Sequence, residues 1–323
     1  MKYLLVDSAN LFFRARHVVR GDIDTKTGMC LHIIFQAINS IYKKFGGQVV
    51  FFFEGRSWRK DHYKQYKLNR KELRDAFNEK EAEEDRIFWQ TFDAFYTFLS
   101  DKTNCVVCQH DNLEADDLIA GWIKNNDTDE HVIVSSDSDF YQLINSHVSQ
   151  YNSITDTLIN NAGHFVFRTM KPVLNKKTKE LLSAPDPEWI LFEKCMRGDS
   201  TDNIFSAYPG VRTKGSKNKI GLLEAFADKD KKGYAWNNLM LQRWVDHEGQ
   251  EHRVLDCYNR NKMLIDLNAQ PNDIKIQIDE CISLSKKKEQ ISQVGIHLMR
   301  FCGKHNLVKI GEQVNDHVKY LNK

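Results

Sequence analysis

Acidic residues stand where strand-like apolar runs end in the first 140 residues. The runs cover 2–7, 49–53 and 131–135, and the acids that end or follow them are Asp7, Glu54, Asp137 and Asp139. Asp137 and Asp139 are i, i+2 neighbours, so on an extended chain both side chains are expected to point the same way. Any one of these acids alone is more often a turn residue or a helix cap than a ligand. An acid at every such position instead predicts one shared site.

Two further acidic groups have the spacing of a single helical face. The sequence Glu-Ala-Asp-Asp at 114–117 follows the short run 105–108, and Glu114 and Asp117 are three residues apart. Asp199 and Asp202 repeat that spacing. Acids before an apolar run are also typical of a first helical turn, where the helix dipole favours them.

Carboxylates gathered in this number would repel one another unless cations neutralised them. Oxygen ligands favour Mg²⁺ or Mn²⁺ over zinc, and two such cations roughly 3.5–4 Å apart clamp the attacking and leaving oxygens of a phosphodiester. The chemistry predicted is therefore phosphodiester hydrolysis by a metal-bound water. Lys67 and Arg70, one helical turn apart, are the candidates for stabilising the scissile phosphate. We expect a first metal region at Asp7, Glu54, Glu114, Asp116 and Asp117, and a second at Asp137, Asp139, Asp199 and Asp202.

The elements that must position these residues alternate between strands and helices. Between the apolar runs lie a helical pattern at Leu31–Phe45, which stops at Gly46-Gly47, a mainly helical region at 58–100, and a helix that opens at Ala115. This alternation predicts an α/β fold with a parallel sheet and helices on both faces, whose strand ends share one ligand-binding edge. The segment 163–188 is irregular, with a basic hairpin expected around 176–179. We expect the chain to be helical from Glu188 to its end, with a domain boundary near residue 190.

The composition is that of a soluble globular protein, with 41% apolar and 28% charged residues in 323. The apolar start is too short for a signal peptide, and no run reaches the roughly 20 apolar residues of a membrane helix. Seven cysteines, an odd number, fit a reducing compartment, so we expect a cytoplasmic protein without membrane association. Trp89 and Trp122 have core-like helical spacing and are expected to pack.

The net charge of +2 hides a strong local separation of charge. From Arg56 to Arg74 there are eight Lys and Arg residues against two acids, interleaved with Trp58, Tyr63 and Tyr66. Such a stretch is either a solvated helix face or a surface for a single nucleic-acid strand, where cations follow phosphates and rings stack on bases.

Taken in order, these motifs resemble the 5′ nuclease family, which comprises flap endonucleases and the 5′-exonuclease domains of DNA polymerases. The resemblance covers about two thirds of the chain and rests on Leu5-Val6-Asp7, Tyr66–Arg70, Glu114–Asp117, Ser136–Asp139 and Gly198–Asn203. Past residue 210 the chain is more similar to the phage enzymes, including the phage RNase H type.

The resemblance implies a PIN-like nuclease core at 1–190, with a helical arch at 56–100, and a helical duplex-binding domain at 191–323. It also implies a helix-three-turn-helix element at Glu193–Ala227, which would hold duplex DNA by its phosphates. The DNA-binding residues expected from it are Arg56, Arg59, Lys60, Lys64, Tyr66, Arg212, Lys214, Ser216, Lys217 and Lys219.

The activity implied is a metal-dependent 5′-3′ exonuclease or flap endonuclease of DNA replication, with two Mg²⁺ that Mn²⁺ can replace. Its substrate would be DNA with a 5′ flap or 5′ end, and RNA in RNA–DNA hybrids is a further candidate. A monomer acting in a phage-infected cell is expected, with a single-strand binding protein or a polymerase as candidate partners.

Two departures from the family pattern leave alternatives open. Glu54 stands where the family has Asp, and the turn Pro209–Ser216 lacks the Gly-Val-x-Gly-Ile-Gly pattern that accompanies a monovalent cation site. The first departure favours a catalytically impaired protein that binds DNA structures. The acidic sheet edge alone is also compatible with an RNA-cutting nuclease of the PIN type.

Overall fold

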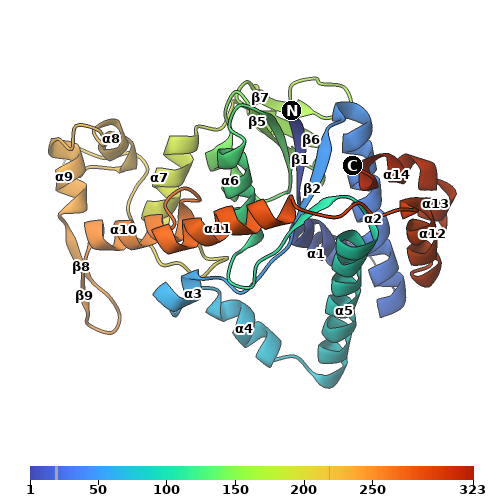
Figure 1. Ribbon diagram of the computed structural model, residues 1–323. Coiled ribbons are helices and arrows are strands. Elements are labelled where there is room, and N and C mark those ends of the chain that lie inside the picture. Colours follow the sequence, from blue (N-terminus) through green and yellow to red (C-terminus); the bar gives the residue numbers. More distant parts are fainter. Residues whose placement is uncertain (19–20, 218) are drawn as a thin grey trace. The chain divides into compact units, whose positions relative to one another are not determined.

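The computed structural model describes residues 1–18, 21–217 and 219–323, which form two compact units (Figure 1). The first unit contains Met1–Ser57, Phe77–Pro185 and Asn272–Lys323. The second contains Trp58–Ala76 and Asp186–Pro271. The chain passes from the first unit to the second at Pro185–Asp186, near the boundary expected at residue 190, and its last 52 residues return to the first unit.

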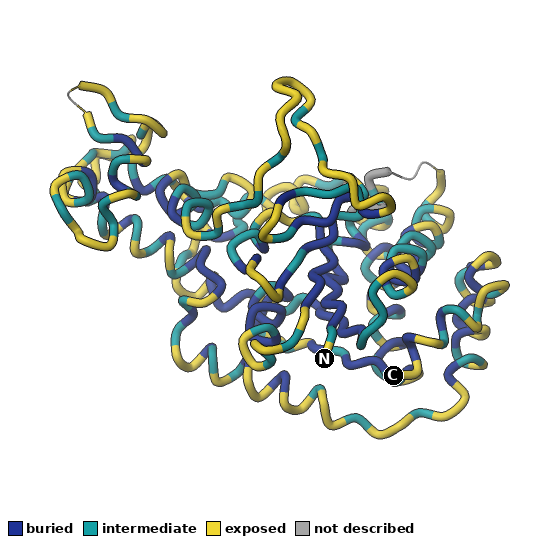
Figure 2. Tube along the Cα trace, turned by 90° about the horizontal axis from the view of Figure 1, so that it is seen from above, coloured by how far each residue is buried: buried dark blue, intermediate teal, exposed yellow. Residues whose placement is uncertain are grey.

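A seven-stranded sheet forms the centre of the first unit, in the order β3-β2-β1-β4-β5-β6-β7. The strands are β1 (Lys2–Asp7), β2 (Gln48–Phe52), β3 (Val106–Cys108), β4 (Glu130–Val134), β5 (Val148–Asn152), β6 (Thr157–Asn160) and β7 (Gly163–Val166). The first five pair in parallel, whereas β6 and β7 are antiparallel additions at one edge. Strands β1, β2 and β4 are buried almost throughout. Figure 2 shows the buried parts of the chain in dark blue.

Helices cover both faces of this sheet, and the alternation of side chains along β1 shows why. Leu4 and Val6 belong to a core shared with α1 (Ser8–Val18), α2 (Ile23–Phe45) and α5 (Glu79–Lys102). Tyr3 points to the other face, where its ring lies 5.3 Å from Trp122 of α6 (Ala115–Asn125). The expected parallel sheet between helical layers is therefore confirmed.

The C-terminal helices complete both layers. In α11 (Asn272–Ser285), Ile278 packs against Gly121 of α6, so closely that a Cβ on Gly121 would lie 2.2 Å from it. On the other face Phe301 stacks on Phe98 of α5 at 4.4 Å. Phe301 belongs to α12 (Val294–Lys304), which is followed by α13 (Val308–Glu312) and α14 (Val314–Leu321). These apolar contacts explain why the tail belongs to the first unit.

The helix expected at Leu31–Phe45 begins eight residues earlier, at Ile23. Asp22 caps it by accepting a hydrogen bond from the N–H of Thr25 at 2.8 Å. The helix ends at Gly46, as predicted. Gly46 has φ 62°, a backbone conformation that glycine adopts without strain.

The second unit is mainly helical. Its elements are α3 (Arg59–His62), α4 (Leu68–Asp75), α7 (Pro187–Arg197), α8 (Leu222–Ala227), α9 (Tyr234–Met240), β8 (Arg243–Val245), β9 (Glu251–Arg253) and α10 (Val254–Ile265). The expectation of helix from Glu188 to the end is wrong at the β8–β9 hairpin. There Trp244 packs on His252 at 4.7 Å across the two strands, and its indole N–H donates to the carbonyl of Ala207 at 2.9 Å.

The segments expected to form an arch and a duplex-binding turn both contain helices. Within 56–100 lie α3, α4 and all but the last two residues of α5. Of this segment, Trp58–Ala76 belongs to the second unit and the rest to the first. In the second unit α7 and α8 flank the segment 198–221, although α7 begins at Pro187 rather than at Glu193. The carboxylate of Glu224 accepts hydrogen bonds from the N–H groups of Gly215 and Gly221, each at 3.0 Å, and so closes this turn.

The basic hairpin expected around 176–179 is present in the first unit. Leu174 and Leu181 form its bridge, and the N–H of Asn175 donates to the carbonyl of Glu180 at 2.8 Å. Across the described residues, no helix is both long and apolar enough to cross a membrane.

Candidate active site

The carboxyl ends of β1, β2 and β4 lie side by side in the first unit. The register pairs Asp7 with Phe52 and Val6 with Val134, so Asp7, Glu54 and Ser135 are at one edge of the sheet. Asp7 is 7% exposed. One of its oxygens accepts from the hydroxyl of Ser135 at 2.9 Å, and the other from the N–H of Asn10 at 3.1 Å. These donors fix the orientation of the carboxylate.

The start of α6 gathers three carboxylates. Ligand oxygens of Glu114, Asp116 and Asp117 all lie within 4.8 Å of one another. Glu114 and Asp117 also form a capping box, which satisfies N–H groups at the helix start. Both are buried, and burying ionised carboxylates costs free energy unless a cation or donors compensate. The oxygen set therefore fits a hard divalent cation.

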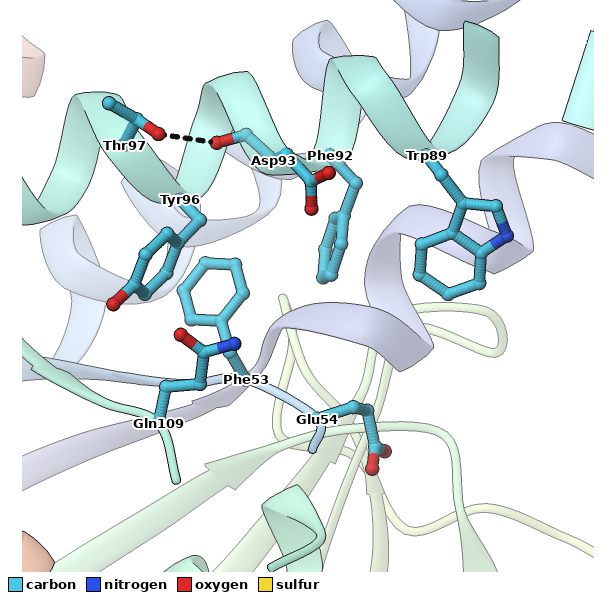
Figure 3. Close-up of a pocket in the computed structure, with 8 residues that line it drawn as sticks. All are labelled: Phe53, Glu54, Trp89, Phe92, Asp93, Tyr96, Thr97 and Gln109. Atoms are coloured by element: carbon cyan, nitrogen blue, oxygen red, sulfur yellow. Dashed lines mark hydrogen bonds between the residues drawn. The ribbon is translucent and has the colours of Figure 1, made fainter. Parts of the chain in front are cut away.

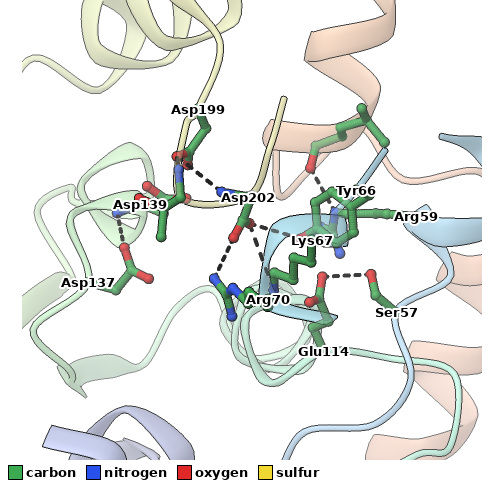
Figure 4. A network of polar contacts seen from close by, with 12 residues as sticks. Ser57, Arg59, Tyr66, Lys67, Arg70, Glu114, Asp137, Asp139, Asp199 and Asp202 are labelled. Atoms are coloured by element: carbon green, nitrogen blue, oxygen red, sulfur yellow. Dashed lines mark hydrogen bonds and ion pairs between the residues drawn. The ribbon is translucent and has the colours of Figure 1, made fainter. Parts of the chain in front are cut away.

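Hydrogen bonds connect this cluster to its neighbours. The hydroxyl of Ser57 donates to Oε2 of Glu114 at 2.7 Å (Figure 4). The N–H of Ala115 donates to Oε2 of Glu54 at 3.4 Å, so the longer side chain of Glu54 reaches the first turn of α6. Asp7 and Glu54 thus lie at the ends of adjacent strands, and Glu54 contacts the first turn of α6.

Asp137 has extended backbone, but Asp139 lies in a 3₁₀ helix, so the two do not share the extended chain that was expected for them. Residues Ser138–Leu143 form a 3₁₀ helix, η1, and Asp137 is its N-cap. One oxygen of Asp137 accepts the N–H of Asp139 at 2.9 Å. The amide of Gln150 donates to the carbonyl of Asp137 at 2.7 Å and holds the turn against β5. Asp137 therefore has the capping role that such a residue has most often.

The family model for the 5′-3′ exonuclease, N-terminal resolvase-like domain, matches residues 2–171, more than half of the chain. The chain belongs to the 5′-3′ exonuclease family. The family expected from the sequence motifs is confirmed.

Relatives of this 5′-3′ exonuclease family member include longer proteins. It is 27% identical to a DNA polymerase I of Rhizobium leguminosarum over 241 residues, which are 70% of this chain and 21% of the polymerase. It is 28% identical to a 5′-3′ exonuclease of Mycoplasmopsis pulmonis over 225 residues, 68% of this chain and 66% of the relative.

Solved structures of bacteriophage T5 proteins share the fold of this chain. A flap endonuclease crystallised with DNA and metal ions has a TM-score of 0.60 and 20% identity, over 89% of this chain and 100% of that one. A 5′-exonuclease with bound zinc ions gives the same figures. At this identity the likeness establishes the fold, and the expected α/β class is confirmed.

In the second unit of this exonuclease family member, the loop after α7 carries Asp199. Its carboxylate pairs with Lys194 at 2.7 Å and accepts the N–H of Thr201 at 2.7 Å. Burial acts to raise the pKa of Asp199, but Lys194 and the N–H groups of Thr201 and Asp202 outweigh it, so the pKa lies below its ordinary value. Asp199 is thus held ionised by residues of its own unit.

Asp202 contacts both cations that were expected to bind phosphate. Arg70 donates to Oδ1 of Asp202 at 2.6 Å, and the ammonium of Lys67 lies 3.8 Å from Oδ2 (Figure 4). The hydroxyl of Tyr66 donates to Oδ2 at 3.0 Å. Within the second unit these three residues surround one carboxylate.

Two residues expected to bind DNA are inside the second unit. Arg59 is 1% exposed, its Nε donates to the carbonyl of Leu264 at 2.7 Å, and its guanidinium lies 4.8 Å from the Trp58 ring. Tyr66 is 3% exposed in a small core with Ile204, so its ring is not presented for stacking. The other expected contacts are exposed: Arg56, Lys60, Lys64, Arg212, Lys214, Ser216, Lys217 and Lys219.

Sequence reasoning missed the partners of the acids. Ser57, Ser135 and Lys194 were not singled out, although each contacts a predicted metal ligand. Ser135 ends a run that leads to two acids, which is a usable signal. Ser57 lies 57 residues from Glu114, and no local pattern connects them.

Proposed function

We propose that this chain is a divalent-metal-dependent nuclease that hydrolyses phosphodiester bonds near DNA 5′ ends. The observation that carries the proposal is the cluster of Glu114, Asp116 and Asp117 beside Asp7 and Glu54 at one sheet edge of a 5′-3′ exonuclease family member. This edge of an open α/β sheet is where such folds bind ligands.

The residues that would hold a first Mg²⁺ or Mn²⁺ are Asp7, Glu54, Glu114, Asp116 and Asp117. The acids expected to shape a second cation are Asp137 and Asp139 in the first unit and Asp199 and Asp202 in the second. When bound, such cations supply a nucleophilic water at neutral pH and neutralise charge on the phosphate. The protein's part is positioning: the hydroxyls of Ser57 and Ser135 orient Glu114 and Asp7, as outer partners of metal ligands commonly do.

Lys67 and Arg70 are proposed to bind the scissile phosphate. Both now contact Asp202, so each would exchange a carboxylate partner for a phosphate oxygen. Arg70 is 45% exposed, and exposed ion pairs are weak enough for that exchange. A guanidinium also matches the geometry of a phosphate.

DNA binding is proposed at the exposed cations Arg56, Lys60 and Lys64 and at the turn between α7 and α8, which carries Arg212, Lys214, Ser216, Lys217 and Lys219. The T5 flap endonuclease of similar fold was solved with DNA and metal ions, which supports DNA as the substrate. Binding should weaken steeply with salt, because phosphate contacts release counterions. We extend the proposal to a monomer that also removes RNA from hybrids, with a single-strand binding protein or a polymerase as partner.

The test uses a 5′-labelled flap duplex with Mg²⁺, with EDTA, and with Asp7→Asn protein in Mg²⁺. We expect short 5′ products only with Mg²⁺, and loss of cleavage with retained DNA binding in Asp7→Asn. Asp111→Asn, at an exposed acid outside the cluster, is the matched control. DNA binding without cleavage by the unmodified protein in both Mg²⁺ and Mn²⁺ would overturn the proposal in favour of a DNA-structure binder. Preference for single-stranded RNA would favour a PIN-type nuclease.

A further inference from the structure

A cavity of about 270 Å³ lies in the first unit, between α5 and the chain that follows β2 and β3 (Figure 3). Phe53 and Glu54 line it from the end of β2, and Gln109 from the end of β3. Small-molecule sites usually have volumes of roughly 300–1,000 Å³. This cavity is therefore sized for a group such as one heterocyclic ring, and not for a whole cofactor.

Aromatic rings make up much of the wall. The ring of Phe53 lies 5.2 Å from that of Phe92 and 5.0 Å from that of Tyr96, and Trp89 lies 5.8 Å from Phe92. Trp89 was expected to pack as Trp122 does, but Trp122 is fully buried whereas Trp89 is only half-buried. Phe53 and Phe92 are buried, whereas Trp89 and Tyr96 are partly exposed, and partly exposed aromatic rings can stack with nucleobases of any sequence.

The polar groups of the cavity select the kind of ligand. Two acidic residues, Glu54 and Asp93, line the cavity together with the amide-bearing Gln109. The described residues that line it include no Lys, Arg or His, so a phosphate would meet no cation. Carboxylates accept hydrogen bonds from the amino groups of bases, as in base recognition by Asp and Glu. Flat, uncharged rings with N–H donors fit this lining, and phosphates do not.

Glu54 connects the cavity to the carboxylate cluster. The residue lines the cavity and also accepts the N–H of Ala115, which stands between Glu114 and Asp116. A ring inside the cavity therefore places the atoms attached to it beside the proposed metal ligands. One side chain therefore contacts both the cavity and the first turn of α6.

We propose that this cavity, the base pocket, holds one unpaired base of the DNA strand being cleaved, next to the scissile phosphate. The inference rests on the proposed nuclease function, and it adds a positioning site for the substrate. Holding the base fixes the adjacent phosphodiester against the carboxylates, which raises the rate by orienting the reacting groups.

The test compares flap substrates with an abasic nucleotide placed in turn at each position on either side of the scissile bond. For the unmodified protein we expect one position at which the abasic nucleotide lowers kcat/KM about tenfold, the size of one lost stacking contact. Trp89→Leu should lower kcat/KM by a similar factor on the intact flap and show no further loss on that abasic flap. Trp89→Phe, which keeps a ring, should retain most of the activity.

A second variant addresses the polar lining without touching the core. Asp93 is exposed on α5, and Asp93→Asn is expected to lower kcat/KM several-fold when adenine or cytosine occupies the sensitive position, but not when thymine does. Asp101→Asn, at an exposed acid on the same helix outside the pocket, should have no such base dependence. Thermal unfolding of each variant shows whether it is folded. If Trp89→Leu is not folded, the comparison of Asp93→Asn with Asp101→Asn still tests the base pocket.

The outcomes separate failure of the base pocket from failure of the nuclease function. Absence of metal-dependent cleavage of the intact flap by the unmodified protein would overturn the nuclease function, and the base pocket with it. Cleavage that is insensitive to abasic nucleotides at every position would overturn the base pocket alone. An equal loss of kcat/KM in Trp89→Leu on intact and abasic flaps would also overturn the base pocket, because the ring would then act only in packing.

Discussion

The guanidinium of Arg70 donates a hydrogen bond to Oδ1 of Asp202 at 2.6 Å, and both residues belong to the second unit. Their side chains are 45% and 17% exposed, respectively. An ion pair with one exposed partner contributes only about 0–1 kcal/mol to stability. The pair is therefore better explained by a role in orienting Arg70 than by a role in folding.

Arg70→Ala should separate activity from stability. We expect the free energy of unfolding to change by no more than about 1 kcal/mol. The single-turnover cleavage rate should fall by about 10²–10³, the usual effect of removing one group that stabilises transition-state charge. Lys71→Ala, at an exposed cation on the same helix, is the matched control. Equal cleavage rates in the two variants would rule out a special role for Arg70.

Ser57→Ala should weaken the response to Mg²⁺. The hydroxyl of Ser57 is buried and donates to Glu114 at 2.7 Å, and losing such an outer partner typically weakens metal affinity 10–100-fold. We expect the Mg²⁺ concentration for half-maximal cleavage to rise by about tenfold, with the rate at saturating Mg²⁺ largely kept. Ser285→Ala, whose hydroxyl donates to the carbonyl of Cys281 in α11, serves as control. An unchanged Mg²⁺ titration would show that Ser57 does not orient the ligand.

Gly55→Ala should destabilise the fold at the end of β2. A Cβ at Gly55 would lie 2.0 Å from the carbonyl oxygen of His110 and 2.8 Å from that of Asp111, so the backbone must shift. We expect a loss of about 1–3 kcal/mol in the free energy of unfolding, measured with urea, and reduced cleavage because Glu54 is adjacent. Gly303→Ala in α12 meets open space and should instead stabilise by about 0.5–1 kcal/mol. Equal stability of the two variants would contradict the close approach at Gly55.

His131 should make the stability of the protein fall at mildly acidic pH. Burial lowers the pKa of His131 to about 4, against an ordinary value of 6.5, although Asp129 acts in the opposite direction. In the unfolded chain His131 therefore becomes protonated as the pH falls through 6.5, whereas in the folded chain it stays neutral until about pH 4. Stability is full above pH 6.5 and is lost as the pH falls toward 4, by at most roughly 3 kcal/mol from this residue.

Urea unfolding between pH 7 and pH 4.5 measures this effect. His131→Leu should lose less stability over that range than the unmodified protein does. His147→Gln, at an exposed histidine, should follow the unmodified protein. His317, whose pKa burial also lowers to about 4, leaves a residual slope in every variant. The same pH slope in His131→Leu would show that His131 is not the cause.

The parallel part of the sheet and its acidic edge could be predicted because their signals are local. Strand β1 has the bounds expected, and β2 and β4 are displaced by one residue. These strands were predictable because each contains an apolar run that ends near an acid. Strands β5 to β7 were not predicted. Gln150 of β5 is fully buried because its amide donates to the carbonyls of Ser135 and Asp137, a compensation that only the folded chain provides.

Residue type also misled the prediction of the DNA-binding surface. Arginine is rarely buried, yet Arg59 is, because the carbonyl of Leu264 and the ring of Trp58 accompany it. Leu264 lies 205 residues away in the sequence. Such long-range partners explain why the acids of the site were predictable and the residues that orient them were not.

Titrating Mn²⁺ into the protein tests the central claim most directly. The claim is that the carboxylates at the start of α6 hold the cation that cleavage requires. Bound Mn²⁺ is read by electron paramagnetic resonance, and cleavage of the flap duplex is followed in the same samples. Unmodified protein, Asp116→Asn and the control Asp111→Asn are compared. We expect Asp116→Asn alone to bind Mn²⁺ at least about tenfold more weakly and to lose cleavage in parallel. Unchanged Mn²⁺ binding with full cleavage in Asp116→Asn would contradict the assignment of the metal site to these carboxylates.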